Sequence, residues 1–195
     1  GLQALPTQWG FAEAAAAEHG QVVDRADWRV VMSWHLAETC EDARRQARDG
    51  MQRWHNEYIV GTLQRPGAVA YDDPDEALEQ ISGGTITSST TTSAVVGTPD
   101  DLVAAIRQVI EVTGGFGKFI GFAHDWANRE DTLRSWDLVA RYVIPEVNGL
   151  VANLRDSQEF VAGNRGIFEQ AGQAVMAKIQ QNPDAAAAHA RGAKG

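Results

Sequence analysis

The sequence predicts an α/β, helix-rich fold with about two parallel strands, of the kind found in (β/α) barrels. Over residues 95–149 a capped helix, a short apolar strand and a second capped helix follow one another, and a His-Asp-Trp cluster stands where the strand ends. Barrels of this kind build their active sites from residues that follow the carboxyl ends of their strands. The segment therefore predicts both a fold class and the position of a site.

The first helix of this segment has clear end signals. Thr98 is a strong cap residue, Pro99 suits the first helical position, and Asp100 and Asp101 lie in the first turn, where the helix dipole favours anions. Gly114 suits the left-handed conformation that ends many helices. These signals predict a helix over about 98–113.

The strand and the second helix follow directly. Residues 116–123 are uncharged except for Lys118, which predicts a mostly buried strand. Asn128 and Asp131 have the spacing of a capping box, and Pro145 predicts the end of the helix that they begin.

The rest of the chain predicts further helices, one more strand and a loop. Thr39 and Asp42 have the spacing that opens a helix, and the Gly-, Ser- and Thr-rich stretch 82–93 favours a loop or a partly mobile lid. The expected elements are a helix at 8–19, a strand at 28–36, a long helix from 39 to 58, a short helix within 72–81 and a final helix at 157–180.

Composition and charge narrow the class of protein. A chain of 195 residues with 44% hydrophobic content predicts one globular domain. The 26 acidic and 17 basic residues give a net charge of −9, which disfavours nucleic acid and anionic membrane as partners. A single cysteine permits no internal disulfide and no apolar run reaches the roughly 18–20 residues of a membrane span, so we expect a cytoplasmic protein. A start at Gly1 rather than Met indicates processing, truncation or a part of a longer protein.

Several segments, taken in order, resemble the bacterial-luciferase-like, flavin-dependent monooxygenases, and among these the limonene-monooxygenase-like group. They are LPTQW at 5–9, VDRADWR at 23–29, HLAET at 35–39, VVGTPDDLVAAI at 95–106, GGFGKFIGFAHDWAN at 114–128, RYVIPEVNG at 141–149 and NRGIFEQAGQAVMAKI at 164–179. The resemblance covers most of the chain, with 58–94 as the exception. It implies the C-terminal part of a (β/α)₈ TIM barrel, over 1–183, with an insertion or lid loop at 58–94 and a flexible tail at 184–195.

A partial barrel implies a partner. Two strands do not make a stable sheet alone, and their unpaired edges would expose hydrogen-bonding groups. The resemblance implies that the first six strands are absent from this chain. We therefore expect it to complete a barrel with another polypeptide, to be the C-terminal part of a longer chain, or to form an oligomer that covers its edges.

The resemblance also implies a function. In the intact family member, reduced FMN from a separate reductase reacts with dioxygen to give a peroxyflavin, which inserts one oxygen atom into an organic substrate. A relative that uses a deazaflavin for hydride transfer is the alternative cofactor. The alternative function is a non-catalytic structural or interaction subunit derived from such a barrel. The isolated chain is expected to be inactive.

Five residues at the ends of the two strands are candidates to line a flavin or substrate pocket. His124, Asp125 and Trp126 follow the second strand, where His could orient a substrate or move a proton. Trp34 and His35 end the first strand, where an aromatic ring could form the wall of an apolar pocket. Helix capping and ordinary core packing are the alternatives for both groups. No residue is identified as a catalytic base, and no spacing indicates a metal site.

Overall fold

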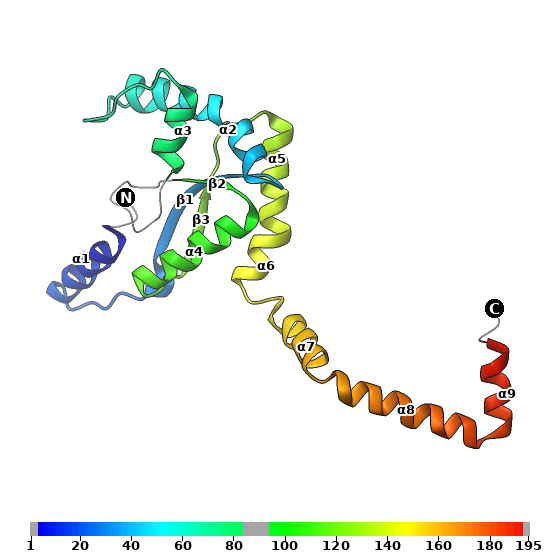
Figure 1. Cartoon of the computed structure of the whole chain (residues 1–195). Coiled ribbons are helices and arrows are strands. Elements are labelled where there is room, and N and C mark those ends of the chain that lie inside the picture. The colour runs from blue at the N-terminus through cyan, green and yellow to red at the C-terminus, as the bar shows by residue number, and fades with distance from the viewer. Residues whose placement is uncertain (1–3, 84–93, 193–195) are drawn as a thin grey trace. The chain divides into compact units, whose positions relative to one another are not determined.

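The computed structural model of the chain describes residues 4–83 and 94–192 (Figure 1). It separates into two compact units, Gly1–Gly149 and Leu150–Gly195, and each is described by itself. Most of the stretch predicted as a lid loop, 84–93, lies outside the described residues. No helix among the described residues is long and apolar enough to cross a membrane.

The first unit contains a three-stranded parallel sheet in the order β2-β1-β3. The predicted strands correspond to β1 (Arg29–Leu36) and β3 (Lys118–Phe122). The third, β2 (Ala94–Gly97), corrects the expectation of about two strands. It has only four residues and leads straight into the cap of the next helix, so it has too few positions to show an alternating pattern.

The strand order places β1 in the centre. In a barrel, consecutive strands are neighbours, whereas here β3 pairs with β1 on the edge away from β2. In the register, Ser33 of β1 stands opposite Ala94 of β2 and opposite Phe122 of β3. The predicted α/β class with parallel strands is confirmed, and the outer edges of β2 and β3 have no strand partner among the described residues.

Helices pack on both sides of this sheet, but they cover only one face along its length. Side chains alternate along a strand, so the even-numbered residues of β1 are buried against helices, whereas Val31 on the other face is 49% exposed. One face packs against α2 (Cys40–Trp54) and α3 (Pro74–Ser82). The other face packs against α4 (Pro99–Thr113) and a continuous run of α5 (Arg129–Leu138), the π-helical segment η4 (Val139–Val143) and α6 (Ile144–Val147).

Each face has its own hydrophobic core. The larger core joins the even-numbered residues of β1 to α4 and η4, with Leu36, Leu102 and Val109 fully buried. The smaller core lies between α2, α3 and β2 and encloses Met51, Leu78 and Trp126. The larger core holds β1, and β2 contributes side chains to both cores, Val95 to the larger and Val96 to the smaller.

An arginine links the N-terminal helix α1 (Leu5–Glu18) to the sheet. Arg25, in the short 3₁₀ turn η2 (Arg25–Asp27), donates to the carbonyl oxygens of Thr113 and Gly115 at the end of α4. Its guanidinium also lies 5.0 Å from the ring centroid of Trp9. A cation at a helix C-terminus is favoured by the helix dipole.

The predicted helix starts agree with the structure. The side chains of Thr39, Thr98 and Asn128 each accept a hydrogen bond from the backbone N–H three residues later, and Thr98 and Asp101 form a full capping box. One predicted end is wrong, because Pro145 lies inside α6. It occupies the first turn after π-helical η4, where a missing N–H is tolerated. The long helix predicted to 58 also changes at His55 into a second π-helical segment, η3 (His55–Thr62).

The second unit is entirely helical over its described residues: α7 (Ala152–Gly163), α8 (Arg165–Gln181) and α9 (Pro183–Gly192). One helix over 157–180 was expected, but Asn164 separates α7 from α8. Residues 184–192, expected in a flexible tail, lie in α9. None of the described side chains in this unit is buried.

Candidate functional site

The five candidate residues lie on two different faces of the sheet. Trp34 points into the larger core with α4, whereas His35 lies on the α2 side. Trp126 belongs to the smaller core on that same side. The alternation of side chains along β1 separates Trp34 from His35, so the structure brings together only part of the predicted set.

His124 stands at the centre of the part that is brought together. Its ring stacks on Trp126 with centroids 4.3 Å apart and an interplanar angle of 4°. Trp54 meets the His124 ring edge-on at 4.8 Å, and Phe122 lies at 5.0 Å. His124 Nε2 shares a 2.9 Å hydrogen bond with the hydroxyl of Ser33. We call these five residues, Ser33, Trp54, Phe122, His124 and Trp126, the His124 cluster.

The local sequence explains this arrangement. Phe122 ends β3 opposite Ser33 of β1, so a histidine two residues later can reach back to the Ser33 hydroxyl. Trp126 then enters the smaller core against α2, where Gly50 leaves room for the backbone. A Cβ added at Gly50 would lie 2.0 Å from the carbonyl oxygen of Trp126.

Burial lowers the pKa of both histidines of this face, which favours the neutral imidazole. Burial lowers the pKa of His124, and the nearby carboxylate of Asp125 opposes that effect only in part. Burial also lowers the pKa of His35, whose Nε2 lies 2.9 Å from Oε1 of Gln46. A neutral imidazole can both donate and accept a hydrogen bond, so His124 can hold or pass a proton at Nε2.

An open hollow of about 540 Å³ adjoins the His124 cluster. Its aromatic lining comes from Trp54, Tyr58, Phe122 and His124. Its charged lining consists of one cation and two carboxylates, contributed by Arg53, Glu57 and Asp125. We call this feature the His124 hollow; it lies at the carboxyl end of β3, where parallel α/β folds place their ligands.

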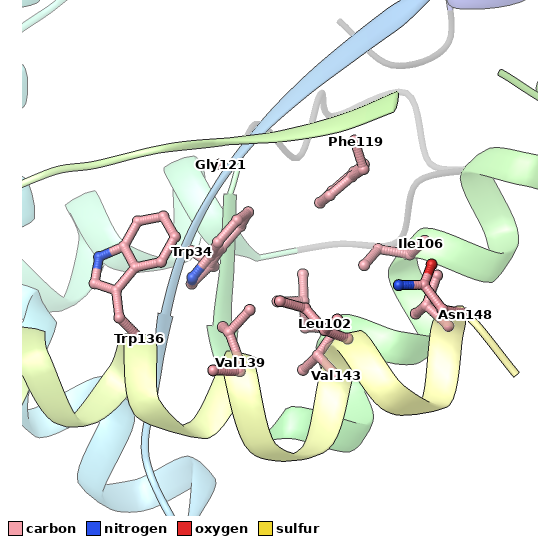
Figure 2. Close-up of a pocket in the computed structure, with 12 residues that line it drawn as sticks. Trp34, Leu102, Ile106, Phe119, Gly121, Trp136, Val139, Val143 and Asn148 are labelled. Atoms are coloured by element: carbon pink, nitrogen blue, oxygen red, sulfur yellow. The ribbon is translucent and has the colours of Figure 1, made fainter. Parts of the chain in front are cut away.

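A second cavity, of about 330 Å³, lies on the opposite face of the sheet (Figure 2). Trp34 forms part of its lining, with Phe119 stacked on it at 6.0 Å and Trp136 tilted against it at 4.9 Å. The buried indole N–H groups of Trp34 and Trp126 have no hydrogen-bond partner among the described residues. We call this feature the Trp34 cavity.

Sequence reasoning missed several residues of the site. Ser33 is a polar residue inside an apolar strand, on the same face as His35, and that position was a usable signal. Trp54 follows Ala47 and Met51 at helical spacing on α2, which marks it as part of the same buried stripe. Gln46, the partner of His35, gave no signal of its own.

The single cysteine is hydrogen-bonded and not set up as a nucleophile. The thiol of Cys40 lies 3.3 Å from Oδ2 of Asp101, and this hydrogen bond raises the pKa of the thiol, which disfavours the reactive thiolate. Within the described parts of the chain, no three His, Cys, Asp or Glu side chains gather as metal ligands.

Comparison with known proteins finds that this chain is similar to monooxygenases. No family model matches it. It is 39% identical to the 4-hydroxyprotoasukamycin monooxygenase of Streptomyces nodosus subsp. asukaensis over 160 residues, or 81% of this chain and 40% of that protein. It is 38% identical to the limonene 1,2-monooxygenase of Rhodococcus erythropolis over 168 residues, or 85% of this chain and 40% of that protein.

A solved structure has a similar fold. It is the oxygenating constituent of 3,6-diketocamphane monooxygenase from Pseudomonas putida, a type II Baeyer-Villiger monooxygenase in complex with FMN. The TM-score is 0.55 at 25% identity, over 75% of this chain and 41% of that one. The three-stranded sheet is thus consistent with part of a luciferase-like barrel. The chain is related to the luciferase-like, flavin-dependent monooxygenases and spans about 40% of the length of the relatives it matches.

Proposed function

We propose that this chain is the C-terminal component of a flavin-dependent monooxygenase that inserts one oxygen atom from dioxygen into an organic substrate. The observation that carries the proposal is the His124 cluster, which joins Ser33 of β1 to the segment that follows β3 through the bond between Ser33 and His124. It adjoins a hollow with aromatic walls in a chain whose relatives are monooxygenases.

The His124 hollow fits the ring system of a flavin better than its phosphate. Trp54, Tyr58 and Phe122 offer the flat apolar surfaces that an isoalloxazine ring packs against. Arg53 is the one cation in the described lining, and Glu57 and Asp125 outnumber it. We infer that the phosphate is held by the rest of the barrel. The alternative cofactor, a deazaflavin, shares the flat tricyclic ring and fits by the same criterion.

A reduced flavin would supply the activation of dioxygen, and a separate reductase would supply the reduced form. The residues of this chain would position and protect the reacting groups. Trp126 stacks on the His124 ring, and the hydrogen bond to Ser33 fixes the direction of the His124 Nε2 atom. The neutral imidazole can then hold a proton or a hydrogen bond beside the substrate, while the aromatic side chains exclude water.

The partner implied by this proposal is the N-terminal portion of the barrel, on the same or another polypeptide. One face of β1 and β3 supports the existence of this partner. On that face, Val31, Ile120 and Phe122 are 49%, 40% and 57% exposed. The open outer edges of β2 and β3 give the same indication. We further propose that the part of 58–94 outside α3 acts as a lid over the hollow, because α3 itself is packed in the smaller core. We also propose that the protein is cytoplasmic and oligomeric.

The test uses a joined protein. In it, this chain replaces the segment of the limonene 1,2-monooxygenase that it matches and is joined to the N-terminal portion of that relative. FMN affinity is measured by flavin fluorescence for this joined protein and for its His124→Ala variant. We expect the variant to bind FMN at least about tenfold more weakly, because it loses one aromatic wall of the hollow. His19→Ala, on the exposed end of α1, is the matched control and should leave the affinity unchanged.

In the same assay, Asp125→Asn tests whether the hollow holds the ring system of FMN or its phosphate. If the hollow held the phosphate, removal of this carboxylate would tighten binding strongly; we expect a change of less than about threefold. A joined protein that binds FMN equally well with and without the His124 ring would overturn the assignment of the hollow.

One observation favours a second function, that of a non-catalytic interaction subunit. The order β2-β1-β3 gives β1 a parallel neighbour on each side, and helices bury one face of the sheet, so it has more cover than two isolated barrel strands would have. A joined protein that folds but has no affinity for FMN would support this second function.

A further inference from the structure

We propose that the Trp34 cavity is a binding site for a small apolar ring compound, separate from the His124 hollow. It lies between the sheet and the helices α4, η4 and α6 (Figure 2). The His124 hollow lies on the other face of the sheet and is lined in part by the end of α2. The proposal does not depend on the proposed monooxygenase function.

The lining of the cavity determines the class of ligand. The rings of Trp34 and Phe119 line the sheet side of the cavity, together with the ring of Trp136. Branched aliphatic side chains from the helices line the other side (Figure 2). Asn148 is the only residue in the described lining with a polar aliphatic side chain, and no charged residue is present. Asn148 and the indole N–H of Trp34 offset little of the hydration that a charged or strongly polar molecule would lose here, so the site selects an apolar one. The lining residues are Trp34, Leu102, Ile106, Phe119, Gly121, Trp136, Val139, Ala140, Val143, Ile144, Val147 and Asn148.

The size of the cavity fits a ring of six to ten carbons. At about 330 Å³ it reaches the lower end of the range for small-molecule sites. An apolar cavity of ~150 Å³ is already large enough to stay dry and bind benzene. Water gains few hydrogen bonds in such a lining, so an apolar ligand has little ordered solvent to displace.

The cavity is shaped by fixed groups and has an entrance. Gly121 forms part of its floor, where an added Cβ would lie 2.1 Å from the Trp34 ring and 2.7 Å from the Trp136 ring. Both rings are therefore held close to the β3 backbone. Trp136 and Ile144 line the cavity and are 36% and 47% exposed, so a ligand can enter beside them.

The experiment uses the full chain and 4-fluorotoluene as the probe, observed by fluorine NMR. We expect saturable binding with a dissociation constant of about 1 mM or lower. Ala140→Trp places an indole at the exposed rim of the cavity and should weaken binding at least tenfold. Ala104→Trp adds the same side chain to an exposed position of α4 outside the lining and should bind as the unmodified chain does.

A second measurement locates the probe without relying on a substitution in the cavity. In the unmodified chain, nuclear Overhauser contacts should join the probe to the indole protons of Trp34 and Trp136, assigned with Trp34→Phe and Trp136→Phe. Absence of saturable binding would overturn the proposal. So would equal binding by Ala140→Trp and Ala104→Trp when circular dichroism shows both folded, or contacts to Trp54 and Trp126 instead.

Discussion

Gly50 occupies a position in α2 at which any side chain meets the backbone of another segment. The contact is with the carbonyl group of Trp126, which cannot turn away as a flexible side chain can. We expect Gly50→Ala to lower the free energy of unfolding by about 2 kcal/mol or more, because the segment that carries His124 must shift. Chemical denaturation measures this change.

Gly10 provides the control. It also lies inside a helix, α1, but a Cβ added there meets nothing within 4 Å. Gly10→Ala should raise stability by about 0.5–1 kcal/mol through the higher helix propensity of alanine. Equal effects at the two glycines would contradict the close approach of α2 to Trp126.

The buried histidines give the stability a pH dependence with a definite sign. Burial lowers the pKa of His124 and His35 in the folded state below the ordinary value of 6.5. The unfolded chain then binds more protons, so this contribution to stability is full above about pH 6.5 and is lost as the pH falls through the folded pKa. We expect the free energy of unfolding to decrease between about pH 7 and pH 5.

His35→Gln and His124→Gln should each make this decrease shallower, in urea titrations at a series of pH values. The exposed His19→Gln serves as the control for loss of a histidine that is not buried. A decrease that is equally steep in all three variants would contradict neutral burial of His35 and His124.

At the scale of elements, α4 is the most strongly specified by local sequence. The Thr98 side chain accepts from the backbone N–H of Asp101, and the Asp101 carboxylate accepts from the backbone N–H of Thr98 at 2.8 Å. Thr98→Ala should cost about 1 kcal/mol of stability, while Thr98→Ser should retain most of it. Thermal unfolding by circular dichroism distinguishes the two, and an unchanged midpoint for Thr98→Ala would show that the box contributes nothing.

Elements with local signals were predictable from the sequence, and elements set by distant contacts were not. Thr39, Thr98 and Asn128 each define a helix start through bonds within four residues, so the sequence identifies them. The strand β2 exists because four residues pair with β1 some sixty positions away. The strand order has the same origin, since no local feature tells β3 which edge of β1 to join.

The candidate site shows the same division. Strand-end chemistry predicted His124, and its partner Ser33 lies 91 positions earlier in the chain. Trp34 and His35 were adjacent candidates, yet the pleat of β1 sends them to opposite faces of the sheet: Trp34 lines the Trp34 cavity, whereas His35 is hydrogen-bonded to Gln46 of α2. The stacking of His124 on Trp126 follows from the turn after β3, which the sequence alone does not fix.

At the scale of the whole molecule, partial length and surface exposure point to the same conclusion. The chain spans about 40% of the length of relatives that are whole monooxygenases. Its sheet keeps two outer edges unpaired among the described residues, and Val31, Ile120 and Phe122 remain exposed on one face. An apolar surface of this kind marks an interaction site in a soluble protein. We therefore expect the flavin site to be complete only when the N-terminal portion of the barrel is present.

Native mass spectrometry tests this central claim most directly. The chain is measured with FMN, first alone and then mixed with the separately produced N-terminal portion of the limonene 1,2-monooxygenase relative. We predict one FMN for each one-to-one complex and none on the chain alone. FMN bound to the chain alone, or a stable assembly of the chain with itself that takes up neither FMN nor the N-terminal portion, would contradict the account.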